Sequence, residues 1–270
     1  MFQEFPATGP VNAQVKLAAG GLEVIAGPDG TISVSVEPAD GSSRSRDAAD
    51  AARIAMSGND LIVEGPDWPG GWLFRGLARL RVTIRIPAGS NLNVKVASAD
   101  VTARGQYRTV SVNGASGDMY VEEATGDVSV NTASGGVRVG RAGGSVRAHS
   151  ASGTVTIGSA GGDVSTTSAS GDVDIQTAGA SVSANTASGD IHVGAAQQGT
   201  VKVNSASGDV VVGVVAGTAV WMDLNTFSGT TNSDLAVGDA APETGTQLTV
   251  QVRTMSGDIT LHRVAARDAA

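Results

Sequence analysis

The amino-acid sequence predicts an all-β protein, a single elongated β-solenoid (β-helix) with coils of about eighteen residues, each built from two nine-residue strand–turn units. Three observations predict this fold. Glycine recurs every nine residues from Gly117, valine or a similar residue follows two positions after each glycine, and about five residues of strand pattern separate successive turns. Such short units leave no room for a helix between parallel neighbours, so coils are expected to stack directly, one on the next, at roughly 4.8 Å. Small side chains suit this packing, since the 270-residue chain has 37 glycines and 3% aromatic residues.

Within each unit, successive residues alternate between the inner and outer face of a strand. The residues expected inside are small or β-branched: Val130, Val139, Ala148, Ile157, Thr166, Ile175, Ala184 and Val193. The residues expected outside are mixed in chemistry: Ser129, Arg138, Arg147, Thr156, Ser165, Asp174, Ser183 and His192. The inner residues form the ladders of a narrow core, and the mixed outer residues indicate a solvated surface.

The fuller repeat is an Asn-Thr-Ala-Ser-Gly-Asp-Val unit that predicts a tight turn. Glycine supplies backbone conformations that other residues avoid, and the adjacent Ser and Asp bond to nearby backbone groups. The structural turn glycines are Gly117, Gly135, Gly153, Gly171, Gly189 and Gly208. An alternative is a cation site, because Asp172, Asp190 and Asp209 recur at coil spacing. Gly136 and Thr154 interrupt that column, and no unit matches the calcium-binding nonapeptide, so we expect a structural turn and no metal site.

Asparagine forms a second column, at positions 113, 131, 185, 204 and 225. Side-chain amides stacked at strand spacing bond to one another along the solenoid axis. We therefore assign Asn131, Asn185 and Asn204 to a structural ladder. A ligand-reading or ice-binding surface is the alternative, but His149 and Thr167 break the column.

The chain is expected to have three parts. Residues 1–97 form an irregular, strand-rich N-terminal part that caps the solenoid, residues 98–213 form the regular repeats, and residues 214–270 form lengthened C-terminal coils and a second cap. The first part contains five strand-like segments: Val11 to Leu17, Thr31 to Val36, Leu61 to Glu64, Leu80 to Ile86 and Leu92 to Val96. The polar stretch at 42–53 is expected to be a loop or a short helix.

The large aromatic residues gather before the repeat and late in it. The earlier group lies beside arginines, and its candidate interaction residues are Trp68, Trp72, Phe74, Arg75 and Arg79. This group is either a patch for a partner or membrane surface, or a cap packed on the solenoid. For Trp221 we expect a capping role.

Composition and charge exclude several classes of function. The chain has no cysteine, three histidines in unrelated registers and no convergent cluster of acids with basic residues, so we expect no cofactor, no catalytic residues and no enzyme activity. The net charge of −8 argues against nucleic acid, and the excess acid lies entirely within residues 111–270. No signal peptide or apolar run of about 18 residues is visible, which predicts a cytoplasmic protein without an integral membrane span.

The strand-rich lead, the RVTIRIPAGSNLNVKVASADV passage at 81–101 and the serial SASGDV units together closely resemble the bacterial putative-adhesin domain of unknown function. This is a β-strand-repeat family that is frequent in actinobacteria. The likeness runs from about Val11 to about Val264. It implies a β-helical fold and supplies no catalytic residue.

Three functions are compatible with these observations. The first is a non-enzymatic, adhesin-like scaffold or protein-binding module that presents a repetitive acidic and polar surface to a protein partner. The second is a self-assembling cytoplasmic filament that associates through the ends of the solenoid. The third and weakest is a β-helical enzyme acting on polysaccharide.

Overall fold

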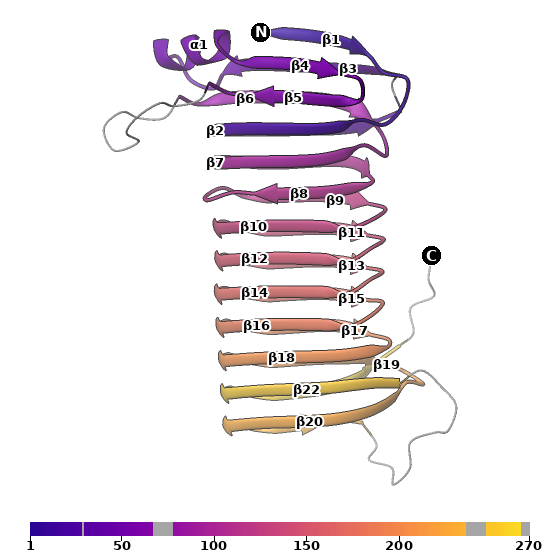
Figure 1. The fold of residues 1–270 in the computed structure, drawn as a ribbon. Helices are drawn as coiled ribbons and strands as arrows, with labels where there is room; N and C mark the ends of the chain where they lie inside the picture. Colours follow the sequence, from indigo (N-terminus) through magenta and orange to yellow (C-terminus); the bar gives the residue numbers. More distant parts are fainter. Residues whose placement is uncertain (29, 67–77, 236–246, 266–270) are drawn as a thin grey trace. The chain divides into compact units, whose positions relative to one another are not determined.

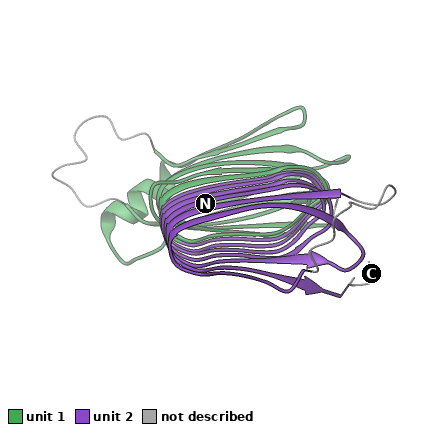
Figure 2. Ribbon diagram, turned by 90° about the horizontal axis from the view of Figure 1, so that it is seen from below, with its two compact units in different colours: residues 1–135 green, residues 136–270 purple. Residues whose placement is uncertain are grey.

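The computed structural model describes residues 1–28, 30–66, 78–235 and 247–265. These residues form two compact units, Met1–Gly135 (unit 1) and Gly136–Ala270 (unit 2), which Figure 2 distinguishes by colour. Both units are built almost entirely from β strands, and unit 1 also contains one described helix. The predicted β-solenoid fold is confirmed.

Unit 2 has two series of parallel strands, each stacked in register apart from a shift between β17 and β19 (Figure 1). One series contains β11 (Val137–Ala142), β13 (Val155–Ala160), β15 (Val173–Ala178), β17 (Ile191–Ala196) and β19 (Val210–Val215). The other contains β12 (Val146–Ser152), β14 (Val164–Ser170), β16 (Val182–Ser188) and β18 (Gly199–Ser207). Because the chain alternates between the two series, each pair of consecutive strands makes one coil.

The register of these strands follows the repeat. Val137 pairs with Val155, and Val155 pairs with Val173, as the valine period predicts. All eight residues expected to point inward are buried, and their outward neighbours are exposed or half-buried. A narrow core of stacked valine, isoleucine, alanine and threonine therefore holds each unit together.

The last two coils of unit 2 depart from stacking in sequence order. The chain passes from β19 to β20 (Ala219–Ser228) and β21 (Thr231–Ser233), and then to β22 (Gln247–Ser256) and β23 (Ile259–Val264). However, β22 pairs with β18 on one side and with β20 on the other. Likewise, β23 pairs with both β19 and β21. The final coil of the sequence is thus inserted between two earlier ones, as Figure 1 shows for β18, β22 and β20.

Unit 1 combines solenoid coils with an antiparallel outer layer. Its elements are β1 (Phe2–Pro6), β2 (Asn12–Gly27), β3 (Thr31–Pro38), α1 (Ser43–Asp50), β4 (Arg53–Ser57), β5 (Asp60–Glu64), β6 (Leu80–Pro87), β7 (Asn91–Tyr107), β8 (Thr109–Asn113), β9 (Met119–Ala124) and β10 (Val128–Ser134). The long strands β2 and β7 pair in parallel, and β7 also pairs in parallel with β8 and β9. By contrast, β1, β3 and β6 pair antiparallel, as do β4 and β5. The five strand segments expected from the sequence correspond to parts of β2, β3, β5, β6 and β7, with β2 beginning at Asn12, one residue after the expected start.

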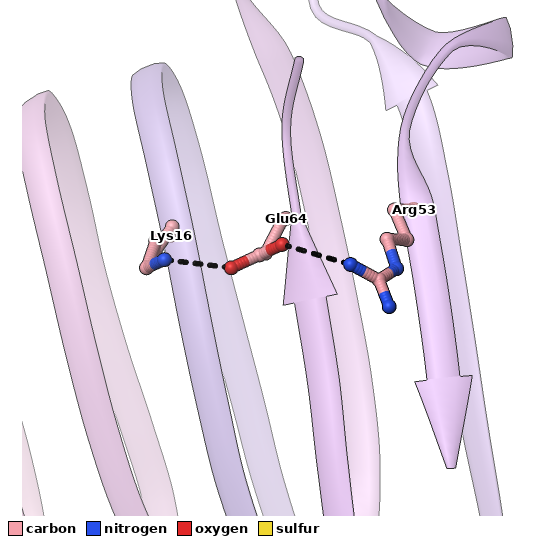
Figure 3. A network of polar contacts seen from close by, with 3 residues as sticks. All are labelled: Lys16, Arg53 and Glu64. Carbon is pink, nitrogen blue, oxygen red and sulfur yellow. Dashed lines mark hydrogen bonds and ion pairs between the residues drawn. The ribbon is translucent and has the colours of Figure 1, made fainter. Parts of the chain in front are cut away.

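A glycine at a close backbone approach and a set of exterior ion pairs hold the strands of the first coil of unit 1 together. Gly20 has a φ of 124° where β2 turns a corner, and a Cβ at this position would collide with the backbone of Leu80. On the exterior, Lys16 donates a hydrogen bond of 2.7 Å to Glu64, which also lies 3.9 Å from Arg53 (Figure 3). The hydrogen bond from Lys16 holds the pKa of Glu64 below its usual value. These contacts link β2, β5 and β4.

The polar stretch at 42–53 contains a short helix, one of the two alternatives expected from the sequence. Ser42 caps α1 by accepting a hydrogen bond of 3.1 Å from the backbone N–H of Ser45. The side chain of Ser45 is buried, and its hydroxyl accepts a hydrogen bond of 3.0 Å from the backbone N–H of Arg79. The helix is therefore anchored to the segment that leads into β6.

Candidate functional site

The aspartates that follow the turn glycines bond to the backbone of the next coil. The carboxylate of Asp172 accepts from the backbone N–H of Asp190 at 2.9 Å, and Asp190 accepts in the same way from Asp209 at 2.8 Å. The series continues in the same direction. The carboxylate of Asp209 accepts from the backbone N–H of Asp258 at 2.8 Å, and that of Asp258 accepts from the backbone N–H of Thr230 at 2.7 Å. The backbone hydrogen bond from Thr230 lowers the pKa of Asp258. This column (the aspartate ladder) thus connects coils, and the described residues contain no group of three or more side chains suited to holding a metal ion.

The glycines that recur every nine residues belong to two different turns. The glycines singled out from the sequence all have positive φ, between 121° and 146°: Gly117, Gly135, Gly153, Gly171, Gly189 and Gly208. A Cβ on Gly189 would lie 2.4 Å from the carbonyl oxygen of Gly171. The other turn of the coil does not need a positive φ where Ala180 occupies it, because no described residue other than glycine has positive φ. One turn of each coil therefore requires glycine for both its conformation and its close packing.

The asparagines make short ladders and not one continuous column. In unit 1 the amide of Asn131 donates to Asn113 at 3.1 Å, and in unit 2 that of Asn204 donates to Asn185 at 2.8 Å. Asn225 does not continue the second ladder, because the inserted strand β22 places Arg253 between Asn204 and Asn225. These amides bond to one another across neighbouring coils.

A groove of about 480 Å³ lies on the β15–β17–β19–β23 side of unit 2. It is lined by Gln176, Thr177, His192, Gly194, Ala195, Gln197, Val215, Val264 and Ala265. Beside it, the register of β17 and β19 shifts: Val193 pairs with Val212, but Ala196 pairs with Val214. The two backbones approach so closely at this irregularity that a Cβ on Gly213 would collide with the carbonyl oxygen of Gly194. Small residues at the shift leave room for the groove.

The polar rim of the groove carries a paired histidine. Nδ1 of His192 lies 3.0 Å from the Oδ1 atom of Asp174, and both side chains are partly exposed. These two residues occupy the same position in successive coils, since β15 and β17 pair them directly. A carboxylate at Nδ1 orients the imidazole ring and leaves Nε2 free to meet a ligand.

The groove has the chemistry of a binding surface. The amides of Gln176 and Gln197 each offer donors and an acceptor, and the hydroxyl of Thr177 offers both. Ala195, Val215 and Val264 add apolar contact area between these polar groups. The sequence did not single out this site. Its visible signals were the eighteen-residue spacing of Asp174 and His192 on the outer face and the paired glycines at 194 and 213.

The outer strand β20 presents a second unusual surface. Its inward residues Val220, Met222 and Leu224 are half-buried, whereas their counterparts in β22, such as Val250 and Val252, are fully buried. On its outer face Trp221 is 57% exposed and Phe227 is 89% exposed. The expectation that Trp221 caps the core is therefore wrong, because strand alternation directs its ring outward.

The aromatic and basic patch expected before the repeat falls largely outside the described residues. Trp68, Trp72, Phe74 and Arg75 belong to the part of the chain that is not described. Arg79 is described, and its backbone carbonyl accepts a hydrogen bond of 2.8 Å from Ala39. Its backbone thus joins the start of β6 to the end of β3, and through the hydroxyl of Ser45 to α1. Among the described helices, none is long and apolar enough to cross a membrane.

Similar folds occur among solved structures at low sequence identity. A putative adhesin from Bacteroides fragilis is 13% identical, with a TM-score of 0.52 over 98% of this chain and 96% of its own. A putative adhesin from Parabacteroides merdae is 13% identical over 98% and 95% of the two chains, with a TM-score of 0.44. A putative lipid binding protein from Parabacteroides distasonis is 10% identical over 98% and 96%, also with a TM-score of 0.44. The Bacteroides fragilis structure supports the fold assignment.

The search of curated proteins found no significant match. A family match does cover most of the chain, from residue 15 to residue 262, which includes most of each unit. The protein belongs to the Toastrack DUF4097 family.

Proposed function

We propose that this protein is a non-enzymatic binding scaffold, and that unit 2 uses its groove to hold an extended segment of a protein partner. The observation that carries the proposal is the groove of about 480 Å³ with amide, imidazole and hydroxyl groups around apolar contacts. Extended peptides offer backbone donors and acceptors to such amides and apolar side chains to the surface between them.

The charge of the second part of the chain favours a basic partner. Residues 111–270 carry all of the excess acid in a chain of net charge −8. Complementary charge speeds the encounter of two proteins and discriminates against wrong partners. A basic segment beside the groove would therefore associate faster at low salt than at high salt.

The distribution of polar groups supports a binding role over catalysis. The aspartate ladder is engaged with backbone N–H groups, and Asp174 at the groove is paired with His192. None of the described residues that line the groove carries a carboxylate, and Asp174 only contacts the lining residue His192. A glycosidase of the common type needs two carboxyl groups on either side of the scissile bond. We also propose that the scaffold acts in the cytoplasm, and immunoblots of cytoplasmic and surface fractions test this location.

Affinity capture from the native cell tests the binding role. The immobilised protein is compared with a His192→Ala/Gln197→Ala variant, and retained proteins are identified by mass spectrometry. We expect a partner that binds the unmodified protein and is lost from the variant, because both changes remove polar groups from the groove.

Thr156→Ala is the matched control, since Thr156 occupies the position of Asp174 one coil earlier on the same face and does not line the groove. This control should retain the partner. Equal capture by all three proteins would contradict the groove as the binding site. Turnover of a polysaccharide that is abolished by Asp174→Asn would contradict the non-enzymatic role.

A further inference from the structure

We propose that β20 is a dimerisation edge, at which two copies of this chain pair their unit 2 ends in antiparallel fashion. This inference goes beyond the proposed function, because it concerns a different surface from the groove. In the described part of the chain β20 pairs with β22 alone, so one side of its backbone has no strand neighbour. A free strand edge with an apolar inner face is a template for another strand.

The side chains of the terminal coils differ from those of the interior coils in a way that favours an interface. In the solenoid coils from Gly117 onward, the outward residue before the Ser-Gly turn is alanine in six units, at positions 115, 133, 151, 169, 187 and 206, and all six are exposed. In the last two coils the same position holds Met255, which is 65% exposed, and Phe227. Large apolar groups thus replace alanine only next to the free edge, and Trp221 lies on the same strand. Aromatic residues and methionine are enriched at protein interfaces.

The occupant is a second copy because the strand is complementary to itself. With Leu224 placed opposite Leu224 of the second copy, Trp221 faces Phe227 and Asp223 faces Asn225. Facing side chains in antiparallel strands have Cβ atoms about 4.5–5.5 Å apart, close enough for an aromatic pair. Both aromatic pairs form at once, one on each side of the symmetry axis.

Neighbouring registers lack this complementarity. A pairing centred on Asp223 would place two carboxylates opposite each other, which is unfavourable. A pairing centred on Met222 would put Trp221 opposite Asp223. The register centred on Leu224 also spans Val220 to Ser228 and continues the inner apolar face from one copy into the other. Because the same strand is used by both copies, this association closes at two and does not extend into a filament.

Sedimentation equilibrium of the full chain over a concentration series tests the oligomeric state. We expect a reversible transition from monomer to dimer. Leu224→Lys places two like charges opposite each other on the axis and should shift the protein to monomer at all concentrations used. A protein that is monomeric throughout, or one that forms larger polymers, would overturn the proposal.

Disulfide cross-linking tests the register and also serves if Leu224→Lys disturbs folding. The natural chain has no cysteine, so each introduced thiol is unique. A mixture of Asp223→Cys and Asn225→Cys proteins should form a cross-linked dimer on mild oxidation, whereas each variant alone should not. Lys202→Cys on the interior strand β18 is the control and should not cross-link in the mixture with Asn225→Cys. Dimers without the mixed cross-link, or equal cross-linking in each variant alone, would overturn the pairing.

Discussion

The carboxylate of Asp209 accepts a hydrogen bond of 2.8 Å from the backbone N–H of Asp258, 49 residues further along the chain. In interior coils the same bond joins residues only 18 or 19 positions apart. The aspartate ladder therefore passes from the β18–β19 coil directly into the β22–β23 coil. This long sequence separation arises because the last coil of the sequence is inserted between two earlier ones.

Removing this acceptor should weaken the attachment of the inserted coil. We expect Asp209→Ala to lower the free energy of unfolding by about 0.5–1.5 kcal/mol, the usual net value of one hydrogen bond. Asp209→Asn keeps an oxygen acceptor and should cost less. Urea unfolding measures both variants, and a larger loss for Asn than for Ala would contradict the role of the ladder.

Interior coils should be removable as whole units. Deletion of residues 155–172 joins Thr154 to Val173, and we expect the protein to stay folded because Val155 and Val173 occupy the same register. Deletion of residues 155–163 removes half a coil and places a strand on the wrong face, so it should abolish cooperative unfolding. Circular dichroism during heating distinguishes the two. Loss of cooperative melting in the full-coil deletion would refute coil equivalence.

The hydroxyl of Thr166 is fully buried and has no hydrogen-bond partner in the described part of the chain. It lies between Ala148 and Ala184 in neighbouring coils. Because an unpaired buried hydroxyl is costly, Thr166→Val should raise the free energy of unfolding by about 1–3 kcal/mol.

Thr186 provides the matched control for this change. Its hydroxyl donates a hydrogen bond of 3.2 Å to the carbonyl of Ser188, so Thr186→Val should be destabilising. Thermal melting and urea titration show whether each substitution raises or lowers the free energy of unfolding. A destabilised Thr166→Val protein would mean that the hydroxyl has a bonding partner in solution.

Tyr107 should make the protein sensitive to alkaline pH. Its ring is fully buried, its hydroxyl donates a hydrogen bond of 2.8 Å to the carbonyl of Val24, and burial raises its pKa above the ordinary value of 10.0. A raised pKa means that folding favours the neutral phenol, so this contribution to stability is complete below about pH 10 and declines as the pH rises further.

Tyr107→Phe should therefore cost about 1–3 kcal/mol near neutral pH, because the carbonyl of Val24 loses its partner. The difference in stability between the natural protein and the variant should shrink above pH 10. Tyr120→Phe, at a half-buried position, is the control and should cost less stability near neutral pH. Denaturant titrations at several pH values provide the measurement, and a pH-independent difference would contradict the assignment.

The regular coils could be predicted because glycine and valine share one period. The valine period fixes which face points inward, and the paired strands of Val137, Val155 and Val173 follow from it. The glycine period alone made both turns of a coil look equivalent. In the coils before β17 only one of the two turns has positive φ, and the signal for the difference was Ala180 in the other turn. The β17–β18 turn is an exception, with Gly199 at a φ of 86°.

The order of the last coils could not be predicted from the repeat. The units starting at Asn225 and Arg253 fit the same coil position equally well, and parallel pairing does not require sequence neighbours to be spatial neighbours. The groove lies beside the register shift between Val193 and Ala196, where the coil spacing lengthens from 18 to 19 residues. It was missed because a one-residue change in spacing does not reveal which side chains line the space beside it. The outward ring of Trp221, in contrast, could have been read from the inward parity of Val220, Met222 and Leu224.

The inserted coil also has a consequence for synthesis. A chain made from its N-terminus exposes residues 219–233 before residues 247–264 exist, yet β20 and β21 pair with β22 and β23. During translation residues 219–233 must therefore stay without these partner strands, or pair transiently with the free edges of β18 and β19. A premature stop after Ser233 would remove the strands that separate these two layers. The outermost coil of unit 2 is thus encoded second to last and can reach its place only after the ribosome has finished the coil beneath it.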